Sequence, residues 1–487
     1  MKSRLFILFL ALSFVRCNDF LEEKSQDEIR PSTVTDMSKI MESEAYFSIG
    51  EGALFNRKTD IFTDDITCAV VEDVSYQIQK EQDHWRYRWD AKMFDEGGGG
   101  EDLSFWKIPY ERIKGCNVVL EYVDGMQGDE MRREHLKGEA YALRGFYYYM
   151  LVNFFGLPYN YGDPTQNLGV PLKLVSGVTA ELFVRNTVAE CYAQIVKDLE
   201  LGAELMEKNK EVHQTKLHLT YLAAHALLSR VYLHMENWNK VIESADAVLN
   251  EYPELLDMKT TPSSSGVYDE RSNVEVLWAG PEKALDQPDQ LAAYPNSMDL
   301  SSVYDIDNDG STDKRRESGK TSSFLHNSWM APELGYFYVY KGWGNLYYTN
   351  GGVRTAEAYI NRAEAYIRKY IESKNREEAQ RGLDDLNTLR NHRIVGNVDK
   401  VLEDFATPEE LLNFCLRERR RELCGEANHR WFDLRRLGMP EIKHIYVDDQ
   451  NGHQTVHTLQ KEDPRYVLPI PERVIEKNPN LRENERK

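Results

Sequence analysis

Cysteine is scarce in this chain, with six residues among 487. Five of the six lie beyond the N-terminal region at irregular spacing, and an odd number does not fit a framework of paired disulfides. Cys415 and Cys424 are nearest in sequence, but on one continuous helix they would lie roughly 13.5 Å apart, too far for a bridge. We therefore expect the fold to depend on its core, with five buried free thiols: Cys68, Cys116, Cys191, Cys415 and Cys424.

Positive charge is in deficit, because 60 Lys and Arg side chains stand against 80 Asp and Glu side chains, a net charge of −20. Such a protein repels the phosphate backbone of nucleic acids, so we expect no nucleic-acid partner. The sequence has no GxSxG nucleophile motif, and the glycines at 97–100 lack the following Lys and Ser or Thr of a phosphate-binding loop. Carboxylates are abundant, but nothing in the sequence marks a catalytic pair, which is defined by its separation in space.

Long apolar runs are absent beyond the N-terminus. Residues 5–15 form an apolar run of eleven residues, about 16 Å long as a helix and too short for a bilayer core of about 30 Å. Lys2 and Arg4 precede this run and Cys17 follows it, so we expect residues 1–16 to be a cleaved signal peptide. Cys17 is then the expected site of lipid attachment. Arg16 stands where a small residue is usual before such a cysteine, and an ordinary secreted protein with a free Cys17 is the alternative.

Apolar residues make up 41% of the chain and aromatic residues 11%, which is ample for a large packed body. The length exceeds the usual size of one hydrophobic core, so we expect more than one structural unit. Helical spacing of apolar residues recurs at 105–126, 135–155, 187–206, 220–234, 238–249, 354–370, 377–392 and 408–437. The small and large side chains in AYALRGFYYY, AAHALLSRVYL and AYINRAEAYI are spaced as in tetratricopeptide repeats.

We therefore predict a mostly α-helical fold, with a tetratricopeptide-like scaffold of helix pairs and an inserted loop-rich subdomain. Gly, Ser, Pro, Asp and Asn are frequent in this subdomain, and a second loop-rich stretch covers residues 59–101. The predicted organisation is a signal peptide at 1–16, an N-terminal helical region at 17–251, the loop-rich subdomain at 252–352, and C-terminal helices with a tail at 353–487.

Two segments near the C-terminus are the most distinctive in the chain. RERRRELCGEANHRWFDLRRLG at 417–438 continues a helical stripe, so we expect one helix over 412–434, with arginines and carboxylates paired along it and Trp431 in the core. In YVLPIPERVIEKNPN the two prolines exclude a regular helix or a central strand. We expect this tail to lie extended against the body, fixed by Tyr466, Leu468 and Ile470.

These two segments resemble the C-terminal end of the SusD/RagB family. CNDFLEE, FWKIPYERIKGCNVVLE, LKGEAYALRGFYYYMLVNFFGLPY and AYINRAEAYIRK resemble the family's start, first repeat and late repeat helix, so the resemblance covers nearly the whole chain after residue 16. It implies a lipoprotein anchored in the outer membrane and exposed at the cell surface, which captures oligosaccharide for a SusC-like TonB-dependent transporter. It also implies no catalysis and no cofactor. A secreted glycan-active hydrolase and a helical-repeat scaffold that binds proteins are the alternatives.

Exposed aromatic rings are the expected contacts for such a ligand, because they stack on the apolar C–H faces of sugar rings. Trp85, Tyr87 and Trp89 alternate, so a strand would place all three on one face. We expect both loop-rich stretches to lie on one side of the scaffold and to share the binding site. The candidate residues are Trp85, Tyr87, Trp89, Tyr294, Trp329 and Trp343. Trp106, Trp278 and Trp431 have helical or apolar surroundings and are expected in the core.

An acidic run at residues 305–317 opens like a calcium-binding loop, with carboxylates at alternate positions and a glycine at the sixth: Asp305, Asp307, Asp309 and Gly310. Arg316 stands at the twelfth position, where such a loop has a glutamate. We therefore expect a solvated turn and no metal, with calcium as the alternative. The SusD/RagB family often has an Asp-x-Arg sequence at this place, which Asp313 and Arg315 match.

Overall fold

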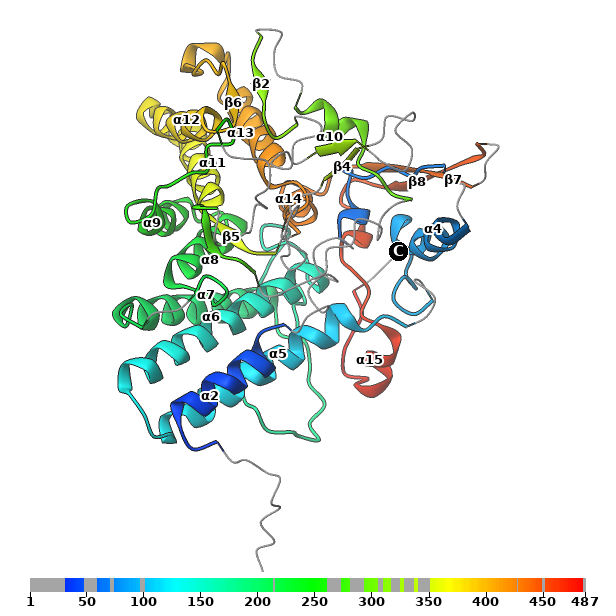
Figure 1. The fold of residues 1–487 in the computed structure, drawn as a ribbon. Helices are drawn as coiled ribbons and strands as arrows, with labels where there is room; N and C mark the ends of the chain where they lie inside the picture. Colours follow the sequence, from blue (N-terminus) through cyan, green and yellow to red (C-terminus); the bar gives the residue numbers. More distant parts are fainter. Residues whose placement is uncertain are drawn as a thin grey trace, which may run out of the picture.

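The computed structural model describes residues 31–47, 59–70, 74–96, 101–212, 215–260, 273–280, 293–304, 310–316, 325–327, 337–339, 351–426, 428–448 and 452–484. Helices account for most of the regular structure in these residues, which confirms the predicted mostly α-helical fold. Neighbouring helices pack against one another in the order of the chain, from α5 to α9 (Figure 1). The helices of this scaffold are α2 (Val34–Ile40), α5 (Ser104–Tyr122), α6 (Glu130–Phe155), α7 (Val188–Lys208), α8 (Tyr221–His234), α9 (Trp238–Leu249), α11 (Thr355–Ser373), α12 (Arg376–Asn391), α13 (Pro408–Leu423) and α14 (His429–Arg436).

The helix pairs that the sequence predicts are adjacent in space. α5 packs on α6 and α7 packs on α8, and α11 packs on α12. α11 also packs on α8 and α9, although the loop-rich region separates it from them in the chain. The loop-rich region is therefore an insertion into a continuous stack of helices.

Local sequence explains where several of these helices begin. Thr187 accepts a hydrogen bond from the backbone N–H of Glu190, and the Glu190 carboxylate accepts one from the backbone N–H of Thr187, so α7 begins with a reciprocal capping box. The side chain of Thr407 accepts a backbone N–H at the start of α13 and so caps this helix. Pro408 follows at the first helical position, where the N–H that proline lacks would have no partner within the helix.

Glycines allow α6 and α7 to cross closely. A Cβ atom added to Gly202 would lie 2.7 Å from the carbonyl oxygen of Gly138, and one added to Gly138 would lie 2.9 Å from the carbonyl oxygen of Gly202. Both distances are shorter than van der Waals contact. The KGEAYALRG and ELGAELM segments therefore need glycine at these positions, because any side chain would separate the two helices.

The strands of the described residues form short antiparallel pairs, and two of these pairs join the loop-rich region to the scaffold. β1 (Val276–Trp278) pairs with β5 (Val353–Arg354), which leads into α11, and β2 (Thr312–Asp313) pairs with β6 (Ile394–Val395), which follows α12. β3 (Leu325–Asn327) pairs with β4 (Phe337–Val339), and β7 (Ile442–Val447) pairs with β8 (Gln454–Leu459). The remaining helices are α4 (Val74–Tyr87), α10 (Met298–Ser302) and α15 (Glu472–Lys477).

The single helix predicted over 412–434 is wrong. The chain forms α13 and α14 with a turn between them, in which Gly425 and Asn428 adopt the left-handed conformation at φ of 65° and 61°. Glycine reaches this conformation without steric cost, and asparagine reaches it more readily than most residues. The Cys-Gly-Glu-Ala-Asn stretch was therefore the sign of a break that the apolar periodicity concealed.

The arginines of this segment pair only partly as predicted. Two pairs along a single helix are present, Arg421 with Glu418 and Arg436 with Asp433. Several arginines are instead buried or mostly buried and reach carboxylates on other elements. The pairs are Arg419 with Asp433 (2.7 Å), Arg420 with Asp65 (2.6 Å), Arg430 with Asp64 (2.6 Å) and Arg436 with Glu364 (2.7 Å). The segment therefore acts as a buried junction between the scaffold and residues 59–70.

Glu422 on α13 is the centre of a second buried network, which joins α13 to the loop-rich region. Its carboxylate lies 3.0 Å from the guanidinium of Arg315, 2.7 Å from that of Arg354 and 3.0 Å from that of Arg393, and all four side chains are buried. Burial favours the neutral acid, but the three guanidinium groups outweigh it and hold the pKa of Glu422 well below its usual range. The carboxylate is therefore charged at neutral pH and ties the loop-rich region to the helices.

The Asp-x-Arg sequence lies in the same network. The Asp313 carboxylate lies 2.6 Å from the Arg315 guanidinium, and both side chains are buried. The expected solvated turn is therefore wrong at this end of the acidic run, because the side chains are enclosed by α13 and by each other.

The core contains the other residues that the sequence placed there. Trp106, Trp278 and Trp431 are buried, and so are the five cysteines beyond Cys17, all as free thiols. The tail is extended as predicted only up to Pro471, because the ERVIEK stretch after it forms the helix α15. In the extended part Leu468 donates its N–H to the carbonyl of Phe154 (2.9 Å), and Tyr466 stacks on Trp431 with ring centroids 5.1 Å apart. The tail thus closes one side of the core.

Candidate functional site

The segment with Trp85, Tyr87 and Trp89 is helical, so the predicted strand is wrong. α4 covers Val74–Tyr87, and Trp89 follows in a left-handed turn at φ 54°. The sequence VSYQIQKEQDHWRY contains Gln, Glu and Lys at most central positions and has neither glycine nor proline. These residues favour a helix, and an alternation of three aromatic residues is too short to override that preference.

Tyr87, Trp89 and Tyr294 are buried in the core, so the expectation that their rings are exposed to a ligand is wrong. Trp89 is fully buried and donates its indole N–H to the carbonyl of Phe62 (3.0 Å). The imidazole of His444 stacks between Trp89 and Tyr87, with ring centroids 4.2 Å and 4.1 Å away. Tyr294 donates its hydroxyl to the carbonyl of Lys80 (2.7 Å). These rings hold α4 against the body and present no face to a ligand.

Trp85 differs from its neighbours because it is only partly buried. The guanidinium of Arg88 lies 4.2 Å from the centroid of its ring, which is a cation–π contact. Val74 and Ile78 are 67% and 52% exposed, and their spacing places them on the same face of α4 as Trp85. We call the face formed by Val74, Ile78, Trp85 and Arg88 the α4 surface.

An imidazole cluster borders the α4 surface. The His84 ring stacks on Tyr446 of β7 with centroids 3.6 Å apart and planes nearly parallel. Its Nε2 atom lies 2.8 Å from Nε2 of His457 on β8, so one imidazole donates to the other. Burial, with the nearby His457 and Arg88, lowers the pKa of His84 to about 4. The ring is therefore neutral at physiological pH and stacks like an aromatic side chain.

Little in the sequence indicates this cluster. His84 is next to Trp85 in the chain, but Tyr446 and His457 lie more than three hundred positions away. Only the fold brings them together, through contacts of α4 with β7 such as the hydrogen bond from the Tyr87 hydroxyl to the carbonyl of Ile445 (3.2 Å).

The two loop-rich stretches meet beside α4. The N–H of Thr67 donates to the carbonyl of Pro295 (2.8 Å), and the N–H of Ala69 donates to that of Ala293 (2.9 Å). Figure 1 shows α4, α10, β4, β7 and β8 together on one side of the molecule, away from α9 and α12. The α4 surface therefore lies where the loop-rich parts of the chain converge on the scaffold.

Several residues proposed from the sequence lie outside the described residues: Cys17, Asp305, Asp307, Asp309, Trp329 and Trp343. In the part of the chain that the structure describes, no three or more His, Cys, Asp or Glu side chains are grouped so that they could hold a metal ion. No helix in those residues combines the length and apolar character needed to cross a bilayer.

Comparison with protein families matches two adjoining parts of the chain. Residues 19–233 match a family described as "Starch-binding associating with outer membrane", and residues 256–486 match one described as "SusD family". A "SusD-like protein P2" from Formosa agariphila is 22% identical, with 99% of each chain aligned. The two matches thus adjoin near the start of the loop-rich region.

Solved structures share the fold. A "putative sugar binding protein" from Bacteroides vulgatus superposes with a TM-score of 0.71 at 23% identity, covering 94% of this chain and 99% of that one. A SusD superfamily protein from Bacteroides thetaiotaomicron gives a TM-score of 0.69 at 21% identity, covering 93% and 100%. The helical scaffold and the inserted region therefore occur together in known folds.

Proposed function

Because this chain belongs to the SusD/RagB family, we propose that it is a glycan-binding lipoprotein of the outer membrane that captures oligosaccharide at the cell surface and passes it to a SusC-like TonB-dependent transporter. The α4 surface is the structural observation that carries the binding proposal, because it combines a partly exposed indole with polar groups at its border. The protein performs no chemistry on the glycan.

The proposed contacts follow from the chemistry of sugars. The apolar face of a pyranose ring stacks on Trp85, while Arg88 and His457 offer donors and acceptors to hydroxyl groups around it. Trp329 and Trp343 remain proposed contacts from the loop-rich subdomain. A few stacking contacts at roughly 1 kcal/mol each, less the cost of ordering the ligand, correspond to affinities in the micromolar to millimolar range. Weak binding suits a protein that must release its ligand to a transporter.

A panel of oligosaccharides tests this function directly. The purified protein should bind at least one of them reversibly, and incubation with the parent polysaccharide should release no reducing sugar. Release of reducing sugar would favour the glycan-active hydrolase instead. Binding of peptides together with indifference to every glycan would favour the protein-binding scaffold.

Lipid attachment gives a prediction of its own. Cys17→Ala should abolish fatty-acid labelling and leave the protein unprocessed or released from membranes, because Cys17 is the cysteine next to the apolar run of residues 5–15 and the next one, Cys68, is about fifty positions further on. Metabolic labelling with a fatty acid and fractionation of membranes measure both effects. Cys68→Ala is the matched control, since that thiol is buried in the fold and should be unlabelled. A wild-type protein without label, or a variant that stays in the membrane fraction, would contradict the prediction.

A further inference from the structure

A groove lies on the scaffold between α5, residues 171–183 and α15, on elements other than those of the α4 surface. Its volume is about 690 Å³. The lining is mainly apolar and includes Trp106, Tyr110, Ile113, Phe183, Val474 and Leu481. A concavity of this size and character takes up apolar groups from a binding partner.

The segment that forms one wall of the groove is fixed in place. Hydrogen bonds from α5 and from the C-terminal tail hold the backbone of this segment, so the segment cannot move to fill the groove with its own side chains. These bonds join the Tyr110 hydroxyl to the carbonyl of Pro171 (2.9 Å), the Asn117 side-chain amide to that of Lys173 (2.9 Å) and the Asn478 side-chain amide to that of Phe183 (2.8 Å). The groove is therefore formed before any partner arrives.

This fixed segment nevertheless exposes apolar side chains to solvent. Five of the eleven residues from 174 to 184 are exposed aliphatic residues: Leu174, Val175, Val178, Leu182 and Val184. Val178 is 94% exposed and also lines the groove. Single exposed apolar residues are ordinary, but a cluster beside an apolar groove indicates a surface that becomes covered.

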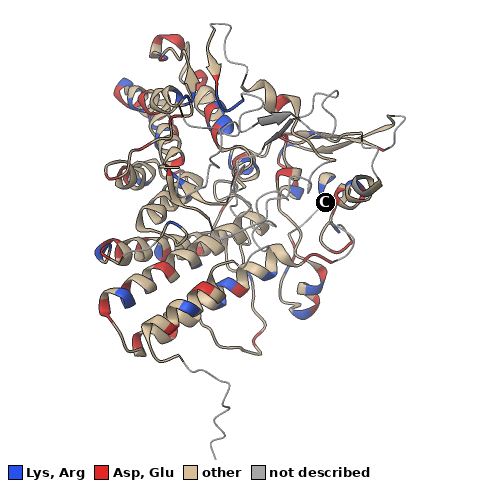
Figure 2. Cartoon of the chain, viewed as in Figure 1, with Lys and Arg blue, Asp and Glu red and all other residues tan. Residues whose placement is uncertain are grey.

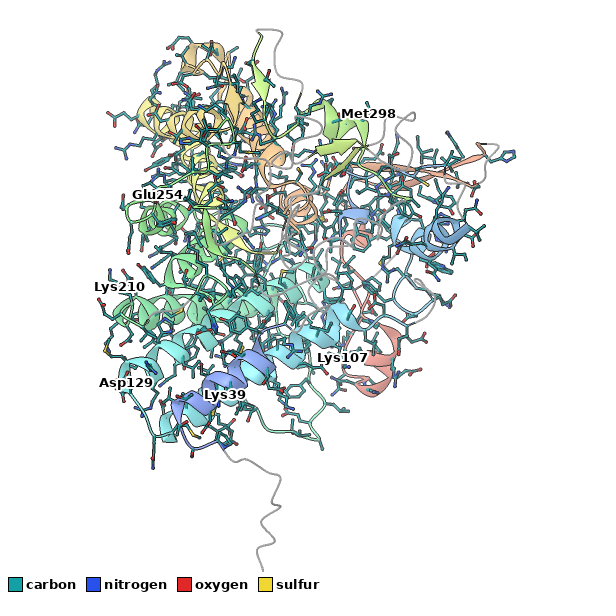
Figure 3. All side chains as sticks on the ribbon, in the orientation of Figure 1. Lys39, Lys107, Asp129, Lys210, Glu254 and Met298 are labelled. Atoms are coloured by element: carbon teal, nitrogen blue, oxygen red, sulfur yellow. The ribbon has the colours of Figure 1, made fainter. Side chains whose placement is uncertain are left out.

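The rim of the groove is basic, although the chain as a whole has a net charge of −20. Its basic residues are Lys107, Lys114, Lys173, Arg473 and Lys477, of which Lys107 pairs with Glu111 and Arg473 pairs with Glu101. Figure 2 marks the Lys and Arg positions on α5 and α15, and Figure 3 labels Lys107 at the end of α5 that faces α15. Lys114 and Lys477 have no carboxylate partner among the described residues, so their charges are available to a ligand.

We propose that this groove and the 174–184 segment form the docking surface for the transporter, and that they receive a segment of it with apolar side chains flanked by Asp or Glu. The proposal rests on the proposed function, because it names the place where the partner of that function binds. Apolar side chains of the partner fill the groove and cover Val178, while its carboxylates face the rim lysines. The α4 surface stays free for the glycan.

A protein segment explains these features better than a lipid surface. The exposed apolar residues of the segment are Leu and Val, whereas proteins that insert at membrane interfaces place Trp and Tyr there. The groove is also concave, and a flat bilayer surface cannot fill it. A side chain that projects from a partner protein can fill the groove.

The test compares two double variants of the full-length lipoprotein in detergent-solubilised outer membranes. Val178→Asp with Leu182→Asp places carboxylates in the docking surface, and Val398→Asp with Val401→Asp places them at other exposed aliphatic positions outside it. Mass spectrometry quantifies how much TonB-dependent transporter is recovered with each protein. We expect at least a tenfold loss for the first variant and none for the second, with unchanged melting temperature and oligosaccharide binding in both. A photo-reactive phenylalanine analogue at position 178 should crosslink to an acidic, apolar segment of the transporter.

Each outcome of this experiment either supports or overturns the proposed docking surface. Wild-type recovery by the Val178 and Leu182 variant, or crosslinks that map to lipid or to a second copy of this chain, would overturn the docking surface and leave the glycan-binding function intact. Failure of the wild-type protein to recover any transporter would overturn both this surface and the proposed partner. Glycan binding is measured on the purified protein alone, so a failure there is separate from either outcome.

Discussion

Glu422→Gln should lower the free energy of unfolding by about 3–5 kcal/mol, the cost of breaking a buried ion pair. The amide would carry no negative charge toward Arg315, Arg354 and Arg393, so these buried guanidinium groups would keep only their other carboxylate partners. Chemical denaturation of the purified variant at pH 7 measures the loss. We expect the loop-rich region to be affected first, because Arg315 lies within it and Arg354 directly follows it.

The stability lost in Glu422→Gln should also depend on pH, in a direction that follows from the pKa of Glu422. The folded-state pKa of Glu422 lies well below that of an unfolded glutamate, so its contribution is fully present above about pH 4.5. It is lost as the pH falls from there toward the folded pKa. The difference in stability between wild type and Glu422→Gln should therefore be constant from pH 7 to 5 and shrink in more acidic solution.

Glu403→Gln is the matched control for this prediction. Glu403 pairs with Arg376 at 2.6 Å, but the two side chains are 72% and 65% exposed, so solvent screens the pair. We expect little change in its unfolding. Equal denaturation midpoints for Glu422→Gln and the wild type would contradict the stabilising role of the buried network around Glu422.

Trp89→Ala should lower the free energy of unfolding by about 3–5 kcal/mol, as large-to-small changes at buried aromatic residues do. The indole is fully buried against His444, and its N–H bonds the carbonyl of Phe62, which would lose its partner. Thermal and chemical denaturation measure the effect. Folded Trp89→Ala protein should keep wild-type affinity for the glycan, because the ring faces no ligand.

Trp85→Ala is the control four residues earlier in the chain. That ring is only partly buried and stacks with Arg88, so its removal should change the melting temperature little. The account would be wrong if Trp89→Ala melted with the wild type, or if Trp85→Ala were the more destabilised of the two.

Sequence periodicity predicted the helical scaffold because helix pairs bury apolar residues at spacings of three and four. It failed at α4, where Trp85, Tyr87 and Trp89 alternate over too few residues to determine a strand. It failed again between α13 and α14, where Gly425 and Asn428 interrupt a stripe that otherwise continues. In both places a local backbone preference competed with the apolar pattern and prevailed.

The buried ion pairs also could not be predicted from the sequence, but here the reason is different. Glu422 is bonded by arginines that lie 29, 68 and 107 positions away, and nothing in the local sequence identifies them as partners. The basic rim of the groove is hidden in the same way, since Lys114 and Lys477 are far apart in the sequence. Long-range pairing of charges becomes visible only when the fold is known.

A rigid base under a loop-rich face suits the proposed function. Glu422, Arg315 and Arg354 fix the ends of the inserted region, while α4 is held by the buried rings of Tyr87 and Trp89. A binding surface that is already ordered loses less conformational freedom when a ligand arrives. Specific capture can then be combined with affinities low enough for release.

The most direct test of glycan capture at the α4 surface is calorimetric titration of wild type and Trp85→Ala with the oligosaccharide that binds best in the panel. The account predicts reversible micromolar to millimolar binding by the wild type and affinity about tenfold weaker for the variant, a loss of roughly 1.4 kcal/mol. Equal affinities for the two proteins, or a wild type that binds none of the oligosaccharides, would contradict it.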